Sequence, residues 1–176
     1  MKDKKIPLLV KVLILHVIFM LLHYLYDWFP NGFTAIFSGI NESVYQHMKI
    51  CFFTYIIFAL IEFQIVRKSI KQPDQYFFSR LFSVTYFPLV MLVIYLIGPL
   101  VFGHIESMLF EIIFANIALL ATSFTTLIVE KQIEGSKPST VFKVVIIILF
   151  VLSFAQFVVF TKELPWFDIF ATPPGW

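Results

Sequence analysis

Hydrophobic residues in this chain run in five long blocks, with polar residues gathered between them. The blocks cover residues 6–29, 45–66, 76–98, 104–129 and 140–161. Each contains the roughly 20 mainly apolar residues that a helix needs to cross the hydrocarbon core of a bilayer. Helix breakers such as PNG, KQPDQ and EGSKP lie between the blocks. The pattern predicts an all-α bundle of five transmembrane helices in a single domain, residues 1–176.

The composition agrees with a membrane protein. Of the 176 residues, 60% are hydrophobic and only 14% are charged, and the mean hydropathy is +0.90. These values lie outside the usual range of soluble globular domains. The apolar blocks are too many and too long for a signal peptide, so we expect no N-terminal processing. The single cysteine, Cys51, excludes an internal disulfide and a cysteine-rich zinc site.

The basic residues predict the orientation of the bundle. If the N-terminus is cytoplasmic, 11 of the 13 Lys and Arg residues fall at the cytoplasmic side, and only Lys49 and Lys162 fall outside. Cytoplasmic loops are enriched in Lys and Arg, so this count favours a cytoplasmic N-terminus and an external C-terminus. The loop 30–44 and the tail 162–176 are then external. The basic residues form no clustered patch, which argues against nucleic-acid binding.

Ionisable residues collect near the predicted outer ends of three helices. His23 and Asp27 lie four residues apart on one helical face, and Ser43 and His47 have the same spacing on the next helix. Glu111 stands alone in the apolar stretch SMLFEIIFAN. Charged groups within a membrane are costly and usually mark function, and such a carboxylate should be protonated or paired with a cation.

Two imidazoles and several carboxylates are a ligand set for zinc or another divalent metal. The predicted metal ligands are His23, Asp27, His47 and Glu111. The predicted catalytic residues are Glu42, Ser43, His47 and Glu111, and the remaining pocket residues are Asn41, Lys49, His104 and Asp168. A metal-bound water would be a nucleophile near neutral pH, with a spare carboxylate as general base. The expected substrate is an ester or amide of a lipid or lipid-linked group in the outer leaflet.

Other interpretations of these residues stay open. Asn41 fits a helix N-cap with Glu42 complementing the helix dipole in the first turn, and Lys49 is expected to extend toward water or pair with an acid. The same acids and imidazoles could relay protons or cations in a small transporter or bind a ligand. They could also hold helices together in an accessory subunit. Whether the protein is an enzyme, and which proteins it contacts, stay undecided at this point.

Two resemblances bear on the stretch HYLYDWFPNGFTAIFSGINESVYQHMKICFF. Ser43-x3-His47 is similar to the S-x3-H of the ceramidase and progestin-receptor-like hydrolase superfamily, although the seven spans and later HxxxH of that superfamily are absent. The N-E-S-x3-H-x-K pattern resembles an uncharacterised family of small Firmicutes-type membrane proteins. The matching residues are His23, Asp27, Trp28, Asn41, Glu42, Ser43, His47 and Lys49, with weaker likeness at Glu111 and Pro165 to Asp168. The resemblance implies a multi-pass protein of the bacterial cytoplasmic membrane.

Overall fold

The computed structural model describes residues 6–103 and 107–161, and their regular structure is helical throughout. Five helices are long and apolar enough to cross a membrane. They are α1 (Leu8–Trp28), α3 (Val44–Val66), α4 (Pro73–Tyr95), α6 (Met108–Glu134) and α7 (Thr140–Val159). Two short helices, α2 (Gly32–Phe37) and α5 (Ile97–Phe102), follow α1 and α4, and a 3-10 turn (Arg67–Ser69) extends α3. The prediction of an all-α fold with five apolar helices is confirmed.

Serine side chains begin three of the long helices. Ser43, Ser107 and Ser139 stand before α3, α6 and α7, and each hydroxyl accepts a hydrogen bond from the backbone N–H three residues later. Such caps satisfy N–H groups that have no partner within the helix. Helix α6 is longer than predicted. It ends at Glu134, five residues beyond the predicted end of the fourth block. Its last turns are polar and carry Glu130 and Glu134.

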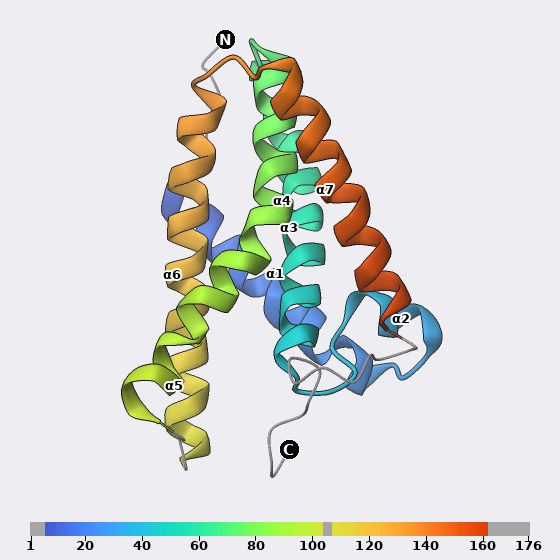
Figure 1. Ribbon diagram of the computed structural model, residues 1–176, viewed down its shortest axis with the longest axis vertical. Helices are drawn as coiled ribbons and strands as arrows, with labels where there is room; N and C mark the ends of the chain where they lie inside the picture. The colour runs from blue at the N-terminus through green and yellow to red at the C-terminus, as the bar shows by residue number, and fades with distance from the viewer. Residues whose placement is uncertain (1–5, 104–106, 162–176) are drawn as a thin grey trace.

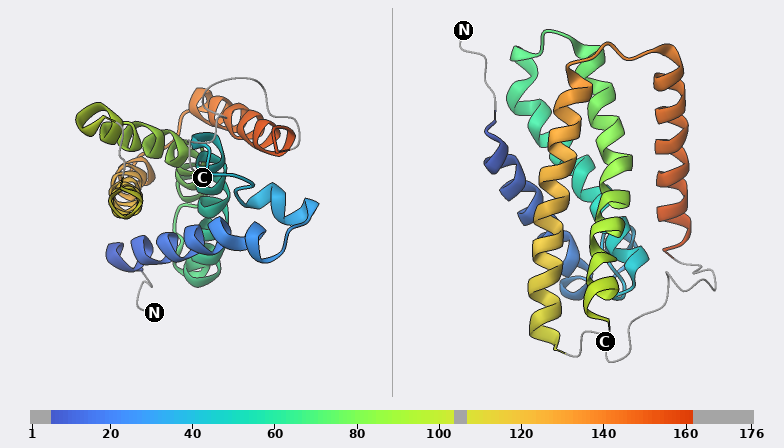
Figure 2. Two further views of the ribbon diagram at one scale, coloured as in Figure 1. Left: turned by 90° about the horizontal axis from the view of Figure 1, so that it is seen from below. Right: turned by 60° about the vertical axis from the view of Figure 1, so that its left-hand side comes forward.

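The helices run up and down along the long axis of the molecule (Figure 1). We call the end at which α1 begins the upper end and the end that contains α2 and α5 the lower end, as drawn in Figure 1. Helices α3 and α4 are central, with α6 on one side, α7 on the other and α1 crossing obliquely behind them (Figures 1 and 2). Helix α1 packs on α3 and α6, and α4 packs on α3, α6 and α7. Four helices, α1, α3, α4 and α6, therefore surround the core.

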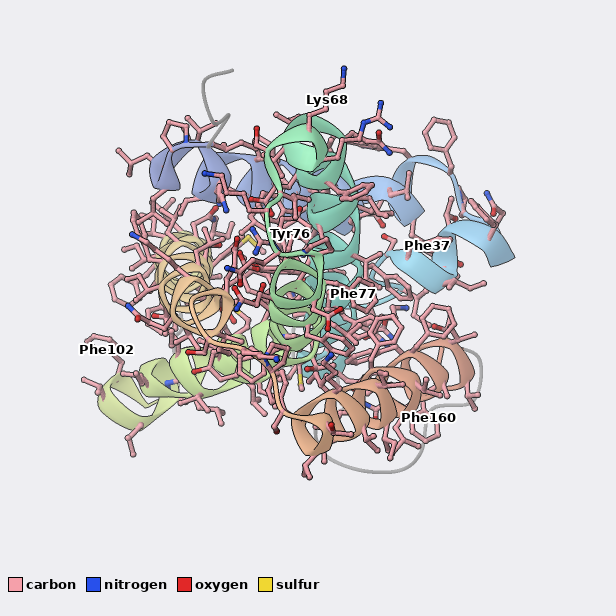
Figure 3. The ribbon with its side chains drawn as sticks, turned by 90° about the horizontal axis from the view of Figure 1, so that it is seen from above. Phe37, Lys68, Tyr76, Phe77, Phe102 and Phe160 are labelled. Atoms are coloured by element: carbon pink, nitrogen blue, oxygen red, sulfur yellow. The ribbon has the colours of Figure 1, made fainter. Side chains whose placement is uncertain are left out.

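Large aromatic side chains fill the middle of this four-helix core. Tyr55, Phe58 and Phe87 are all fully buried, and the ring centroids of Tyr55 and Phe87 are 5.2 Å apart. Phe52 is also fully buried, but its ring packs against phenylalanines of α7. The outer surface instead carries many exposed Leu, Ile, Val and Phe side chains, above all on α7, as expected for helices that face lipid tails. Seen from the upper end, Tyr76 lies among the helices while Lys68 projects from the periphery (Figure 3).

Helix α4 contains a proline in its interior, Pro88. Proline has no backbone N–H and its ring clashes with the preceding turn, so it bends a helix and leaves the carbonyl four residues earlier without that partner. The lower part of α4 turns toward α6 (Figure 1). Close contact continues below, where Gly98 of α5 lies against the ring of Phe114 on α6. The bend therefore brings the lower parts of α4 and α6 together.

Candidate metal centre

Two histidines and one glutamate meet near the lower end of the bundle. His23 lies on α1, Glu42 in the loop before α3, and His47 in the first turns of α3. The Nε2 atoms of the two histidines are 3.3 Å apart. Each of these atoms is 3.4 Å from Oε2 of Glu42. Three atoms that can each donate a lone pair to a metal thus form a nearly equilateral triangle.

The loop between α2 and α3 carries Glu42 to this position. Its first residue, Ser38, is fully buried, donates a hydrogen bond to the carbonyl of Leu22 and accepts one from the N–H of Tyr26 at 3.1 Å. At the other end, the side chain of Asn41 accepts a hydrogen bond from the N–H of Ser43 at 3.0 Å. The loop is therefore fastened to α1 beside His23 and enters α3 through a defined turn.

Two kinds of contact orient the imidazole rings. Nδ1 of His47 lies 2.9 Å from the carbonyl oxygen of Ser43 and donates to it, so Nε2 is the nitrogen that faces Glu42 and that can bind a metal once it has lost its proton. A backbone carbonyl is a common partner for the second nitrogen of a metal-binding histidine. His23 is held by ring contacts, with its centroid 6.0 Å from Phe19 and 5.0 Å from Tyr24. Both Nε2 atoms point toward Glu42.

The two histidines also control the charge of Glu42. Hydrogen bonding to His23, and then to His47, holds the pKa of the Glu42 carboxyl well below its usual range, against the opposing effect of burial. Glu42 is therefore a carboxylate, the form that binds metals. The side chains of His23, Glu42 and His47 are 18%, 32% and 27% exposed, so the three groups are partly shielded from solvent.

The triangle has the dimensions of one face of a zinc tetrahedron. Zinc binds histidine nitrogen and carboxylate oxygen at about 2.0–2.1 Å, and the edge of a regular tetrahedron is about 1.63 times that length, or roughly 3.3–3.4 Å. The three measured distances are 3.3, 3.4 and 3.4 Å. Among the described residues, one group of three possible ligands has donor atoms that all lie within 4.8 Å of one another, and it consists of His23, Glu42 and His47. The donor set and its spacing both fit zinc.

A cavity of about 200 Å³ adjoins the triangle. All four core helices line it, and its walls are mainly apolar, with Phe19, Met48, Met91 and Leu119 among them. We call it the lower cavity. Tyr95 of α4 and Glu111 of α6 also line it, and the Tyr95 hydroxyl donates a hydrogen bond of 3.2 Å to Glu111. One space therefore holds the three potential ligands, a separate carboxyl group and an apolar surface.

Several predicted site residues lie elsewhere or have another role. Asp27, a predicted metal ligand, is exposed and lies apart from the ligand triangle. Glu42 provides the carboxylate of the triangle instead, because the loop before α3 passes beside His23. Glu111 lines the cavity but is not one of the three clustered ligands. Ser43, fully buried, caps α3, so the expectation of Asn41 as the cap is wrong. The predicted pocket residues His104 and Asp168 lie outside the described residues.

Lys49 differs most from its expected environment. Its side chain is fully buried and does not extend toward water. The ammonium group donates hydrogen bonds to the carbonyl of Ala35 at 2.7 Å and to the hydroxyl of Thr161 at 3.2 Å. Ala35 lies near the end of α2, where carbonyl groups favour a positive charge. Lys49 thus connects α3 to α2 and to Thr161, the second residue after the end of α7.

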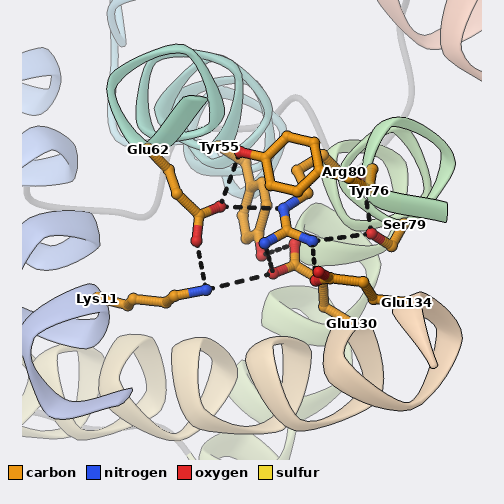
Figure 4. A network of polar contacts seen from close by, with 8 residues as sticks. All are labelled: Lys11, Tyr55, Glu62, Tyr76, Ser79, Arg80, Glu130 and Glu134. Carbon is orange, nitrogen blue, oxygen red and sulfur yellow. Dashed lines mark hydrogen bonds and ion pairs between the residues drawn. The ribbon is translucent and has the colours of Figure 1, made fainter. Parts of the chain in front are cut away.

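A second polar cluster lies at the upper end, within the same four helices (Figure 4). Arg80 of α4 forms ion pairs with Glu62 of α3 at 3.0 Å and with Glu130 of α6 at 3.6 Å, and a further pair with Glu134. Lys11 of α1 pairs with Glu62. Glu62 and Glu130 are each 1% exposed and Arg80 is 7% exposed. These five residues are the charge network.

Two tyrosines complete the charge network, and a cavity opens beside it. The hydroxyl of Tyr55 donates to Glu130 at 2.7 Å, and that of Tyr76 donates to Glu62 at 3.4 Å. The upper cavity measures about 560 Å³ and is lined by Lys11, Glu62, Arg80 and polar residues of the helix ends.

The sequence did contain a signal for the charge network, since charges of opposite sign occur inside three predicted spans. Pairing them across helices required the packed structure.

Comparisons with known proteins place the chain in a family without a known activity. A family model described as a family of unknown function (DUF6512) matches residues 1–172, so the chain belongs to that family. The expectation of an uncharacterised family is confirmed to that extent. Neither the curated proteins nor the solved structures contain a significant match.

Proposed function

We propose that this member of the DUF6512 family is a zinc-dependent membrane hydrolase or transferase that acts on an ester or amide of a lipid or lipid-linked group. The observation that carries the proposal is the triangle of His23, Glu42 and His47, whose edges of 3.3–3.4 Å match a tetrahedral zinc site. Three protein ligands and one open position are the usual arrangement of catalytic zinc, whereas structural zinc has four protein ligands.

The proposed orientation puts the metal centre on the outer side of a bacterial cytoplasmic membrane. Basic residues collect at the upper end, where Arg67, Lys68, Lys131 and Lys137 lie at helix ends or in loops. Because cytoplasmic loops are rich in such residues, the upper end would face the cytoplasm. The lower cavity would then open in the outer leaflet, and its apolar walls would receive the hydrocarbon part of the substrate.

The residues of the lower cavity have distinct roles in this proposal. His23, Glu42 and His47 would hold zinc, which when bound supplies a Lewis acid and acidifies a coordinated water. Glu111 takes a proton from the attacking water, whose oxygen forms a bond to the acyl carbon. The acyl–oxygen or acyl–nitrogen bond then breaks, and the proton on Glu111 passes to the leaving group. The Tyr95 hydroxyl keeps Glu111 oriented before reaction.

Metal content and hydrolysis in matched variants test this proposal. Purified protein loaded with zinc and freed of excess should retain about one ion per chain, because three protein ligands hold it. His47→Gln should lose the ion, whereas His16→Gln, which removes an imidazole outside the triangle, should keep it. Fluorogenic medium-chain acyl esters and acyl amides in detergent micelles then serve as substrate probes.

The expected activity results separate binding from catalysis. Hydrolysis by the parent should be lost in His47→Gln together with zinc, and lost in Glu111→Gln with zinc retained, by a factor of about 10²–10⁴ for a missing general base. A parent protein that retains no zinc would refute the metal site. Zinc binding without any hydrolysis of either probe class, or with full activity in Glu111→Gln, would refute the proposed chemistry.

A further inference from the structure

The two cavities lie at opposite ends of the same four helices. On α1, Phe19 lines the lower cavity and Lys11 the upper cavity. On α6, Leu119 lines the lower cavity and Leu127 the upper cavity. Each pair is eight residues apart, which corresponds to about 12 Å along a helix at 1.5 Å per residue. Only a short section of packed core therefore separates the two cavities.

Helices α4 and α6 face each other across this section, and two contacts show which of their residues lie at the same level. At the upper side, Arg80 of α4 contacts Glu130 of α6. At the lower side, the sulfur of Met91 lies 3.6 Å from the hydroxyl of Thr122, and Met91 lines the lower cavity. Because the helices are antiparallel, the residues between these two contacts lie opposite one another.

Two hydroxyl groups occupy this interval. Ser83 lies one turn below Arg80 on α4, and Thr126 lies one turn below Glu130 on α6. Both side chains are 0% exposed. The Thr126 hydroxyl has no hydrogen-bond partner among the residues that the structure describes. The Ser83 hydroxyl makes no hydrogen bond of ordinary geometry there, but it interacts with the Tyr55 side chain. The hydroxyl of Thr54 on α3 is also fully buried and also has no hydrogen-bond partner among the described residues.

An additional acceptor lies beside Ser83. Pro88 cannot donate a backbone hydrogen bond, so the carbonyl of Val84 does not receive one from it. Buried polar groups without a partner are costly, and in proteins they are commonly satisfied by internal water. A water molecule needs two to four polar partners. The hydroxyls of Ser83 and Thr126 and the Val84 carbonyl supply partners of that kind within the core.

We propose that water bound by Ser83 and Thr126 connects the upper charge network to the lower cavity and forms a path for protons through the bundle. A gap of about 12 Å corresponds to roughly four hydrogen-bonded links of about 2.8 Å. Protons can pass along such links, and chains of acidic and polar side chains serve as proton relays in membrane proteins. The fully buried rings of Tyr55 and Phe87 occupy the same core, which disfavours passage of a hydrated metal ion.

Glu130 is the group from which the path would begin at the upper end. It faces Arg80 at 3.6 Å and Lys11 at 3.9 Å, and accepts a hydrogen bond from the Tyr55 hydroxyl. Glu62 and Glu134 share Arg80 with it. A proton that enters from the upper cavity can therefore be exchanged among three carboxylates before it reaches Thr126. This activity is separate from the proposed hydrolysis and needs no metal.

Proton flux into vesicles tests the path. Purified protein is reconstituted into vesicles containing a pH-sensitive dye and a chelator, and a potassium diffusion potential set by valinomycin drives protons inward. The parent should acidify the lumen faster than protein-free vesicles. Thr126→Val should slow the flux about tenfold, the effect expected from losing one hydrogen bond on the path. Glu130→Gln should reduce it at least as much, whereas Thr126→Ser, which keeps the hydroxyl, should conduct like the parent.

Matched variants distinguish the path from a general loss of structure. Thr85→Val removes an α4 hydroxyl that is bonded to the carbonyl of Phe82, and its flux should equal that of the parent. Lys143→Met, which removes an exposed ion pair with Asp74 away from both cavities, should also conduct normally. The assay contains a chelator and no added metal, so failure of the metal proposal leaves this test intact. A parent no faster than empty vesicles would overturn the proposal. Equal flux through Thr126→Val and Thr126→Ser, with both variants folded, would overturn it as well.

Discussion

Replacing Arg80 by methionine should destabilise the protein far more than removal of a surface ion pair. Arg80 is 7% exposed and contacts carboxylates on α3 and α6. Methionine keeps an apolar stem but leaves Glu62 and Glu130, each 1% exposed, to share the ammonium group of Lys11, which lies close to both. Removing one partner of a buried ion pair costs about 3–5 kcal/mol, because the remaining charge stays buried.

The cost converts into a measurable melting shift. For a chain of 150–250 residues, 1 kcal/mol corresponds to about 2–4 °C in Tm, so Arg80→Met should lower Tm by about 6–20 °C. Lys143→Met is the control, since it removes an ion pair with Asp74, whose side chain is 71% exposed. Exposed pairs contribute at most about 1 kcal/mol. The control should therefore shift Tm by less than about 4 °C.

Thermal unfolding of detergent-purified variants, followed by circular dichroism, provides the measurement. Adding Glu130→Gln to Arg80→Met should recover part of the lost stability, because the double variant has one fewer unpaired carboxylate. If Arg80→Met melts within the range of Lys143→Met, the charge network does not hold the helices together. The same conclusion would follow if the second substitution lowered Tm further.

Three other substitutions or treatments have defined outcomes. Gly98→Ala should lower stability by about 1–3 kcal/mol in the same melting assay, because the added Cβ would lie 2.5 Å from the Phe114 ring. Ser38→Ala should weaken zinc binding by about tenfold or more in a competition titration, since it frees the loop that carries Glu42. Zinc at 100 times its Kd should stabilise the parent by about 2.7 kcal/mol, and chelation should reverse this, whereas His47→Gln should respond to neither.

The five long helices could be predicted because their apolar blocks match the thickness of a bilayer. His23, Glu42, His47 and Glu111 could be selected because ionisable groups are rare and costly near a membrane. The structure places all four around the lower cavity. The exact ligand set was less accessible, since Asp27 shares a helical face with His23 but Glu42 arrives through a loop whose path depends on the buried Ser38.

The charge network illustrates what local patterns leave out. Arg80 contributes to the count of cytoplasmic basic residues, and Glu62 looks like an isolated acid within its span. Their 3.0 Å contact arises only when α3 packs against α4. Glu130, which lies fifty residues after Arg80 in the chain, joins them from α6. Spacing within one helix identifies a shared face, whereas ion pairs between helices depend on the register of packing.

X-ray absorption at the zinc edge on the loaded, purified protein tests the central claim most directly. The proposed centre predicts nitrogen and oxygen neighbours at about 2.0–2.1 Å, with the outer scattering of two imidazole rings. His47→Gln should abolish the bound signal. A sulfur neighbour at about 2.3 Å, which would implicate Cys51, or a zinc ion surrounded by oxygen without imidazole scattering, would contradict the centre formed by His23, Glu42 and His47.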